Sequence, residues 1–491
     1  IDARSVEVQC ALSAGVPHFS LVGLPDKAVS EARERVRAAL SSMSIALPSR
    51  RITVNLSPAD LPKEGSHFDL PIALALLAAI EIVPKDAVET LVALGELSLD
   101  GGLVPVTGAL PAALAAAEAG RSLMCPAASG AEAAWAGDTP VIAPSTLGEA
   151  IQHLTGARVL SPSQPGVVQE ERHGPDLADV KGQERAKRAL EIAAAGRHHL
   201  LMVGSPGSGK SMLAARLPGI LPDLAPSEAL ETSMVHSLAG LIASGGISRR
   251  RPFRAPHHTA SMAAIVGGGK GAKPGEISLA HNGVLFMDEF PEYPRGVLET
   301  LRQPIETGDV TVARANAHVR YPCRFMLIAA ANPCKCGYLA EPARACARVP
   351  ACGEEYMGRI SGPLMDRFDL RVEVPPVSFQ DLDLPAKGEA SAAVASRVAN
   401  ARQVQAKRYK ALPDARVNAD ASGALLDEIA APDQDGRALL SKAAERIGLS
   451  ARGYHRVLRV ARTIADLDGR ETVQATDIAE ALSFRIAGMA A

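Results

Sequence analysis

The feature that most constrains the fold of this chain is a glycine-rich loop at 204–211, which has the form G-x-x-x-x-G-K-S. An apolar run at 199–203 precedes it and a helix-compatible segment at 212–216 follows. Between a strand and a helix, such glycines let backbone amides approach phosphates, and the helix N-terminus adds positive potential. This predicts an α/β nucleotide-binding fold rather than a turn without a ligand. The expected nucleotide contacts are Gly204, Ser205, Pro206, Gly207, Ser208, Gly209, Lys210, Ser211 and, from a later strand, Asp288.

A second motif, at 283–289, is an apolar strand that ends in two acidic residues. We expect Lys210 to reach the β- and γ-phosphates and the Ser211 hydroxyl to hold Mg²⁺. Asp288 at the strand tip suits the same Mg²⁺ shell, and Glu289 is placed to polarise the attacking water. A buried strand that happens to end in acids is the plainer alternative. The acidic motif follows the glycine-rich loop and precedes another strand, and this order favours a role in ATP hydrolysis.

A third apolar run, at 325–331, ends at Asn332. If this strand lies between the other two, the Asn332 amide reaches the γ-phosphate and senses it. Because Asn332-Pro333 is also a good turn dipeptide, an ordinary strand-end turn is the alternative.

Composition limits the partners and the compartment. The net charge of −2 means that any nucleic-acid contact must come from local basic patches. No apolar run is long enough to span a bilayer, and no secretory signal is visible, so we expect a cytoplasmic protein without a membrane partner. The seven cysteines then favour thiols or a metal over disulfides. Because the chain begins at Ile1 and not at Met, we expect some N-terminal residues to be missing.

Several segments of the chain resemble those of the magnesium-chelatase-like AAA+ ATPases of bacteria, and among them the ComM/YifB family. The resemblance spans the chain and is carried by residues 23–26, 53–60, 95–100, 252–261, 274–289, 332–337 and 361–369. It implies ATP and Mg²⁺ as ligands, a homo-hexameric ring, and a DNA helicase that drives branch migration during natural transformation. The DNA would be single-stranded or branched.

The resemblance also implies three domains. Residues 1–165 are expected to form an α+β domain like ribosomal protein S5, Lon and RadA. Residues 166–385 are expected to form the AAA+ αβα domain, with an insert after the second helix. Residues 386–491 are expected to form a helical lid. The sequence patterns predict a strand at 52–56, helices at 71–82, 111–120, 437–447, 450–468 and 475–486, and polar breaks at 161–166 and 381–388.

Two arginines are expected to complete the ATP site. Arg367 follows the sensor strand, where an arginine usually lies at a subunit edge and reaches a neighbour's γ-phosphate; Arg359 is the reserve candidate. Arg452 opens a lid helix, from which it would contact the nucleotide in its own or a neighbouring subunit.

Two basic elements are candidates for DNA contact. The long insert carries Arg249, Arg250, Arg251, Arg254 and Lys270. A hairpin at 310–320 carries Arg314 and Arg320. Phosphate contacts from such residues supply sequence-independent, salt-sensitive affinity. A solvated loop, a subunit contact and an ordinary exposed hairpin are the alternatives, and His257 and His258 are expected to be structural more often than functional.

Four cysteines follow the sensor strand: Cys334, Cys336, Cys346 and Cys352. Four thiolates suit a structural Zn²⁺ site, although the C-x-C spacing is tighter than usual, and free thiols are the equal alternative. The family usually has proline where this chain has Lys335, and its later cysteines are more closely spaced.

Three other functions are weighed against the helicase. A Lon-like Ser–Lys peptidase is disfavoured, because His67 falls at the serine position and the helix at 107–120 has no lysine. A motor subunit of magnesium-chelatase type, remodelling a protein partner for metal insertion, is the main alternative. A scaffold that uses nucleotide only as a switch is disfavoured by Glu289 and Arg367.

Overall fold

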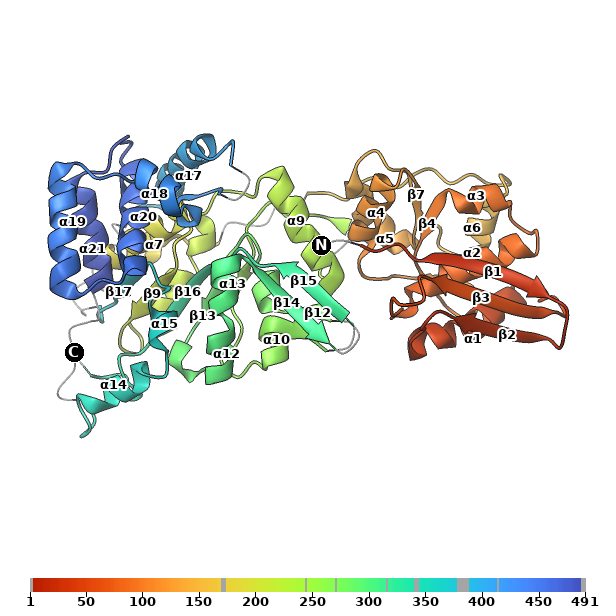
Figure 1. Cartoon of the computed structure of the whole chain (residues 1–491), viewed down its shortest axis with the longest axis horizontal. Coiled ribbons are helices and arrows are strands. Elements are labelled where there is room, and N and C mark those ends of the chain that lie inside the picture. Colours follow the sequence, from red (N-terminus) through yellow and green to blue (C-terminus); the bar gives the residue numbers. More distant parts are fainter. Residues whose placement is uncertain are drawn as a thin grey trace.

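A five-stranded parallel sheet forms the centre of the protein in the computed structural model (Figure 1). The structure describes residues 3–168, 174–242, 245–269, 272–314, 317–339, 344–377, 388–412 and 415–486. The strand order is β10-β13-β16-β9-β17, and every neighbouring pair runs parallel. The strands are β9 (Leu200–Val203), β10 (Phe253–Arg254), β13 (Val284–Met287), β16 (Met326–Ala331) and β17 (Leu370–Glu373). Because β13 and β16 are buried along their whole length, they have continuous apolar sequences.

The predicted place of the sensor strand is confirmed. β16 pairs with β9 on one side and with β13 on the other. The carboxyl ends of these parallel strands therefore meet at one edge of the sheet, where the glycine-rich loop, the acidic pair and Asn332 follow them directly.

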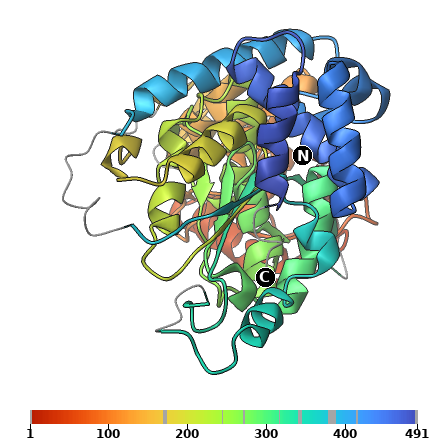
Figure 2. The same ribbon diagram turned by 90° about the vertical axis from the view of Figure 1, so that its left-hand side faces the viewer.

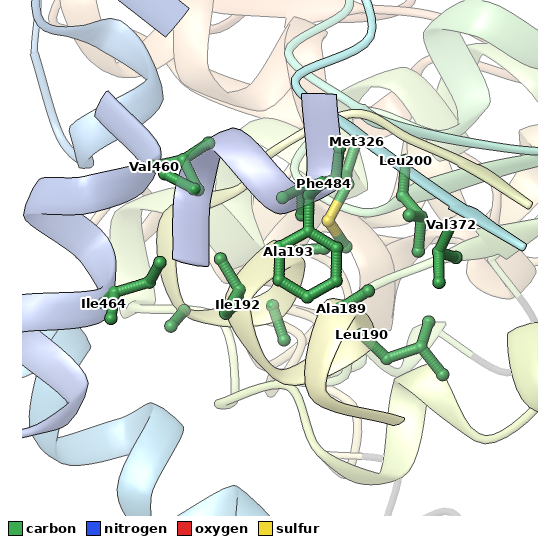
Figure 3. Close-up of a cluster of buried hydrophobic side chains, with 14 of the residues drawn as sticks. Ala189, Leu190, Ile192, Ala193, Leu200, Met326, Val372, Val460, Ile464 and Phe484 are labelled. Atoms are coloured by element: carbon green, nitrogen blue, oxygen red, sulfur yellow. The ribbon is translucent and has the colours of Figure 1, made fainter. Parts of the chain in front are cut away.

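Helices from distant parts of the chain cover this sheet. The helices of the central segment are α7 (Glu184–Gly196), α8 (Lys210–Ala214), α9 (Pro226–Ala239), α12 (Arg295–Thr300), α13 (Arg302–Thr307), α15 (Gly362–Met365) and, projecting away from the sheet, α14 (Ala351–Met357) (Figure 1). Figure 3 shows one shared core, in which Phe484 from the C-terminal helices lies among side chains of α7 and the strands. Burying such an aromatic side chain stabilises the fold by roughly 1.5–3 kcal/mol.

The C-terminal segment is helical, as predicted. It comprises α17 (Ser391–Arg408), α18 (Gly423–Ile429), α19 (Gln434–Ile447), α20 (Ala451–Leu467) and α21 (Ala475–Ile486). The predicted helix ends at 447, 468 and 486 agree with α19, α20 and α21 to within one residue. Side chains explain two helix starts, because Asp433 and Ser450 each accept a hydrogen bond from a backbone amide of the first turn. Figure 2 shows these helices on one side of the central sheet.

The N-terminal segment forms a separate α+β unit at one end of the elongated molecule (Figure 1). Its first sheet has the order β1-β3-β2, and a second has the order β4-β7-β8. The elements are β1 (Glu7–Ser13), β2 (His18–Val22), α1 (Lys27–Ser42), β3 (Arg51–Ser57), α2 (Asp69–Ala79), α3 (Lys85–Glu89), β4 (Leu91–Ala93), β5 (Glu96–Leu97), β6 (Leu103–Val104), α4 (Ala109–Glu118), β7 (Ser122–Met124), α5 (Ala127–Ala133), β8 (Val141–Ile142) and α6 (Leu147–Leu154). The likeness to ribosomal protein S5 and the domain boundaries at 165 and 385 stay predictions.

Specific polar contacts join this unit to the central segment. The Glu132 carboxylate of α5 accepts hydrogen bonds from the Ser237 hydroxyl of α9 and from the Leu110 amide. The Trp135 indole donates to the carbonyl of Gly245 at 2.8 Å. A buried carboxylate without such partners would be costly, so these bonds fix where the two units meet.

The long insert between α9 and β13 contains β10, α10 (Met262–Val266), a short hairpin of β11 (Gly267–Gly268) and β12 (Lys273–Pro274), and α11 (Glu276–Leu279). The predicted second hairpin is present as β14 (Asp309–Arg314) and β15 (Ala317–Pro322). The two hairpins pack together, since a Cβ added to Gly267 would meet Val312 Cγ2 at 3.0 Å.

A buried ionic cluster ties the C-terminal helices to the sheet. Asp369, directly before β17, accepts hydrogen bonds from Arg456 of α20 at 2.6 Å and from the His199 amide at 2.9 Å. Burial alone would raise the pKa of Asp369, but Arg456 and then His198 outweigh it and hold the pKa well below its ordinary value.

We therefore expect Asp369→Asn to destabilise the folded protein by about 3–5 kcal/mol at neutral pH, because it leaves the Arg456 charge buried without a partner. The check is the thermal unfolding temperature, with exposed Asp427→Asn as the matched control. Since the folded pKa is depressed, this stabilisation is present above the unfolded pKa of about 4 and is lost as pH falls through the folded value. A variant that unfolds at the wild-type temperature at pH 7 would show that the pair contributes nothing.

Candidate functional site: a phosphate-binding edge of the sheet

The glycine-rich loop leaves β9 and enters α8 in a conformation that only glycine allows at two points. Gly209 has φ of +93°, a left-handed value that strains other residues. A Cβ at Gly204 would lie 2.2 Å from the carbonyl oxygen of Val374, so that position has no room for a side chain. The loop is thereby held against the adjacent strand end, with Lys210 at the first position of α8.

Lys210 is the centre of the loop. Its Nζ donates to the carbonyls of Gly204 at 2.7 Å and Ser205 at 2.9 Å, and lies 3.3 Å from Asn332 Oδ1. Burial lowers the pKa of Lys210, and the charge of Asp288 opposes that effect. The Lys210 ammonium group therefore lies between the glycine-rich loop, the acidic strand end and Asn332.

The predicted Mg²⁺ ligands are also adjacent. Ser211 Oγ donates to Asp288 Oδ2 at 2.5 Å, and the Glu289 amide donates to Asp288 Oδ1 at 2.8 Å. A hydroxyl and a carboxylate oxygen are hard donors of the kind that Mg²⁺ prefers. The residues present thus fit a magnesium ion shared with a nucleotide.

Glu289 has a partner that the sequence analysis did not single out. Glu289 itself adopts a left-handed backbone, with φ of +50°, and its Oε2 lies 2.9 Å from His258 Nδ1. His258 follows β10, a parallel neighbour of β13, so both residues extend from the same edge of the sheet. The neighbouring ring of His257 packs on His258 with centroids 4.2 Å apart, while its own Nδ1 faces Thr259. The sequence carries no local signal for this contact, because the contact depends on β10 lying next to β13.

The expected arginine finger is engaged within its own chain. Arg367 pairs with Glu306 at 2.5 Å and donates to the carbonyls of Arg302 and Pro363, and its side chain is 8% exposed. Arg359 pairs with Glu292 at 3.0 Å and its side chain is 50% exposed. A contact with another subunit therefore requires Arg367 to leave three partners, whereas Arg359 is already at the surface.

Arg452 lies in the first turn of α20 with an exposed side chain. The hydroxyl of Ser450 lies 3.4 Å from Asp366 Oδ2, which places the start of this helix beside the segment that carries Arg367.

The basic insert divides into structural and exposed arginines. Arg251 donates to Glu228 at 2.8 Å and to the carbonyls of Pro222 and Asn282. Arg254 forms a two-point pair with Glu276 at 2.6 and 2.7 Å. Arg249 is exposed. Arg250 is partly buried and interacts with its surroundings. The charge that predicted a phosphate-binding patch is therefore largely neutralised at Arg251 and Arg254.

The remaining candidate DNA contacts are Lys270, Arg314 and Arg320. Lys270 and the side chain of Arg314 lie outside the described part of the chain. Arg320 is exposed on β15, where it pairs with Asp309 of β14.

Three of the four cysteines after the sensor strand are gathered. The sulfur atoms of Cys334, Cys336 and Cys352 all lie within 4.8 Å of one another. Cys346 is close enough to influence the pKa values of Cys336 and Cys352, but it is not a member of this set. The backbone amide of Tyr338 and the neighbouring thiols lower the pKa of Cys336 to about 6. Free thiols and a soft metal site both remain compatible with this cluster. Cys10, Cys125 and Cys323 lie outside it as free thiols.

Comparison with known proteins places the whole chain in one family. Sequence profiles of "Subunit ChlI of Mg-chelatase", "Magnesium chelatase, subunit ChlI" and "Magnesium chelatase, subunit ChlI C-terminal" match residues 6–129, 176–382 and 388–485. The competence protein ComM of Haemophilus influenzae is 44% identical over 492 residues, covering 99% of this chain and 95% of that protein. The protein YifB of Escherichia coli is 41% identical over 488 residues, with 99% and 95% covered. The magnesium-chelatase 38 kDa subunit of Rhodobacter capsulatus is 27% identical over 212 residues, with 40% and 54% covered.

Within the described residues, no helix combines the length and apolar character that crossing a bilayer requires.

The contact between His258 and Glu289 predicts a role in ATP hydrolysis. If His258 orients the Glu289 carboxylate, His258→Ala should lower kcat about tenfold, because the carboxylate is no longer held in position. KM should stay nearly unchanged, because nucleotide binding is not affected. His258→Asn, which keeps a donor, should recover part of the rate. His257→Ala is the matched control and should resemble wild type. A rise in kcat for His258→Ala would instead mean that His258 holds the carboxylate away from water.

Proposed function

Since the chain belongs to the magnesium-chelatase-like family that includes the proteins named ComM and YifB, we propose that it is an ATP-driven motor that moves along branched DNA and promotes branch migration. The observation that carries the proposal is the convergence of Lys210, Ser211–Asp288 and Asn332 at one sheet edge, in a chain similar over its full length to a competence protein. The N-terminal unit, which we take to be S5-like, would guide the DNA or act as a scaffold.

The chemistry of the site is phosphoryl transfer to water. Lys210 would withdraw its Nζ from the loop carbonyls and neutralise charge on the β- and γ-phosphates. Ser211 and Asp288 would hold Mg²⁺, which supplies further charge neutralisation when bound. Glu289 would accept a proton from the attacking water or polarise it, and Asn332 would donate its amide to the γ-phosphate.

Assembly as a homo-hexameric ring would complete each site with an arginine from the neighbouring subunit. The planar guanidinium suits the charge spread over the γ-phosphate oxygens. Arg367 is the first candidate and would exchange Glu306 for that phosphate. The half-exposed Arg359 needs to leave only Glu292, and this lower cost supports it as the second candidate. Arg452 would contact the nucleotide from the lid.

Contact with DNA is proposed for the exposed cations of the insert and the hairpin. Arg249 is the exposed member of the run at 249–251, and Arg320 projects from β15. Arg314 at the end of β14, and Lys270, which lies outside the described residues, stay candidates. Arg251 and Arg254 pair with Glu228 and Glu276, so we assign them a structural role in fixing the base of the insert.

Nucleotide chemistry is tested by two substitutions in the proposed centre. Lys210→Ala should lose ATP binding, because the phosphates would lose the cation expected to contact them. Glu289→Gln should bind ATP with near-wild-type affinity and hydrolyse it at least a hundredfold more slowly, because the neutral amide polarises water poorly. ATP binding and steady-state hydrolysis, each measured with and without four-way-junction DNA, check both expectations. Wild-type hydrolysis by the Glu289→Gln protein would refute the assignment of the base.

A matched pair of arginine substitutions tests the DNA contact. Arg249→Ala should weaken DNA binding similarly for all sequences and flatten its salt dependence by up to about 0.9 log unit per lost duplex-phosphate contact. Arg251→Ala removes a half-buried ion pair, so it should lower the unfolding temperature more than Arg249→Ala does. Basal ATP hydrolysis should survive in Arg249→Ala. If this variant binds DNA and migrates junctions like wild type, the insert is not the contact, and Arg320 becomes the next residue to test.

A protein-remodelling motor of magnesium-chelatase type is the second candidate. The similarity to a magnesium-chelatase subunit over 40% of the chain supports it. Hydrolysis that is indifferent to every DNA tested, in a protein that still requires Lys210 and Glu289, would favour this alternative.

A further inference from the structure

We propose that Cys334, Cys336, Cys346 and Cys352 bind one Zn²⁺, and that this metal holds the loop after the sensor strand against the phosphate-binding loop. The metal site rests on the thiols alone. The coupling to the phosphate-binding loop additionally rests on the proposed nucleotide site.

The geometry of the sulfur atoms fits a tetrahedral ion. With Zn–S bonds of about 2.3 Å, ligand sulfurs in a tetrahedron lie about 3.8 Å apart. The Sγ atoms of Cys334 and Cys336 are 3.1 Å apart, and Cys352 completes a set in which no pair exceeds 4.8 Å. Small rotations of these side chains bring them to the required separations. The C-x-C spacing therefore does not prevent both residues from binding the same ion.

The fourth ligand comes from a separate stretch of chain. Cys346 lies near Cys336 and Cys352, but its sulfur is outside the set of three that are all within 4.8 Å of one another, so it must move inward to complete the tetrahedron.

The exposed Lys335, between the first two ligands, suits this chemistry. Binding of Zn²⁺ by four thiols releases four protons and leaves the cluster with a charge of −2, so a nearby cation reduces the electrostatic cost.

The cluster is mechanically close to the nucleotide site. Gly337, which directly follows Cys336, has φ of +86°, and a Cβ added to it would lie 2.5 Å from two ring carbons of Pro206. Pro206 belongs to the phosphate-binding loop, and the cluster begins two residues after the sensor Asn332. The tight turn at 334–337, closed by a hydrogen bond from the Gly337 amide to the Cys334 carbonyl at 3.0 Å, thus rests directly on the loop that would bind phosphates.

The metal would fix this turn from its other side. Cys352 lies on α14, and a Cβ at Gly353 would meet Leu339 Cδ2 at 2.8 Å, so α14 packs closely on the same loop. Crosslinking 334–336 to α14 through Zn²⁺ limits how far Gly337 can move from Pro206. Loss of the metal would free the turn, and part of the nucleotide-binding energy would then be spent on ordering it.

The first arm of the experiment measures metal. Full-length protein purified without chelator should contain about one Zn²⁺ per chain, Cys10→Ala should contain the same, and Cys346→Ala and Cys352→Ala should contain markedly less. The four thiols should react with a thiol reagent only after a zinc-selective chelator is added. Protein without metal, whose cluster thiols react at once or form a disulfide, would overturn the metal site.

The second arm measures nucleotide affinity in a binding assay, so it does not depend on activity. Removing Zn²⁺ from wild-type protein should raise the Kd for ATP about tenfold, which corresponds to about 1.4 kcal/mol, and adding Zn²⁺ back should restore it. In Pro206→Ala the same treatment should change the Kd little, because the contact that transmits the effect is already lost.

The two arms distinguish failure of the metal site, failure of its coupling to the phosphate-binding loop, and failure of the proposed nucleotide site. If zinc is present but its removal leaves the ATP affinity of wild-type protein unchanged, the coupling is wrong and the metal site stands. If no preparation binds ATP, the proposed nucleotide site fails and the metal content still decides the first arm. Unfolding on removal of zinc, seen by circular dichroism and not reversed by Zn²⁺, would overturn the local coupling in favour of a global structural role.

Discussion

The meeting of three parallel strand ends at one edge of the sheet is the constraint on which the rest of this structure depends. Lys210, Asp288 and Asn332 follow β9, β13 and β16 and lie together at this edge. Two hydrogen bonds link them: Ser211 bonds to Asp288, and Lys210 bonds to Asn332. Parallel strands need long connections, and in this chain the connections contain candidate functional residues of their own. The insert before β13 and the loop after β16 therefore both begin or end beside the phosphate-binding loop.

That arrangement brings two outlying elements into contact with the nucleotide site. The insert returns to the sheet edge through His258, which touches Glu289. The loop after the sensor strand returns through Gly337, which touches Pro206. In our proposals the insert faces DNA and the loop is fixed by a metal. The first contact would link the nucleotide site to DNA and the second would link it to a metal, because Glu289 and Pro206 both belong to the expected phosphate site.

Charge is informative here only once its partners are known. Arg251, Arg254 and Arg367 carry the same formal charge as the exposed Arg249, but carboxylates of their own chain pair with all three. Arg359 is also paired, with Glu292, but its side chain is half exposed. Removing one of the first three leaves its carboxylate without a partner and acts on stability, whereas removing an exposed arginine acts on binding. Asp369 and Arg456 are another paired couple, and they hold the C-terminal helices on the sheet without belonging to the phosphate site.

The sequence by itself determined the nucleotide-binding class, the three strands of the site, their order and the ends of the last three helices, because glycine patterns, apolar runs and helix caps are local signals. It also placed the family, through motifs spread along the whole chain. Only the tertiary structure decided which arginines are paired, that His258 reaches Glu289, and that Gly337 rests on Pro206. These contacts join residues far apart in sequence, and their existence depends on strand adjacency and packing, which composition and spacing do not encode.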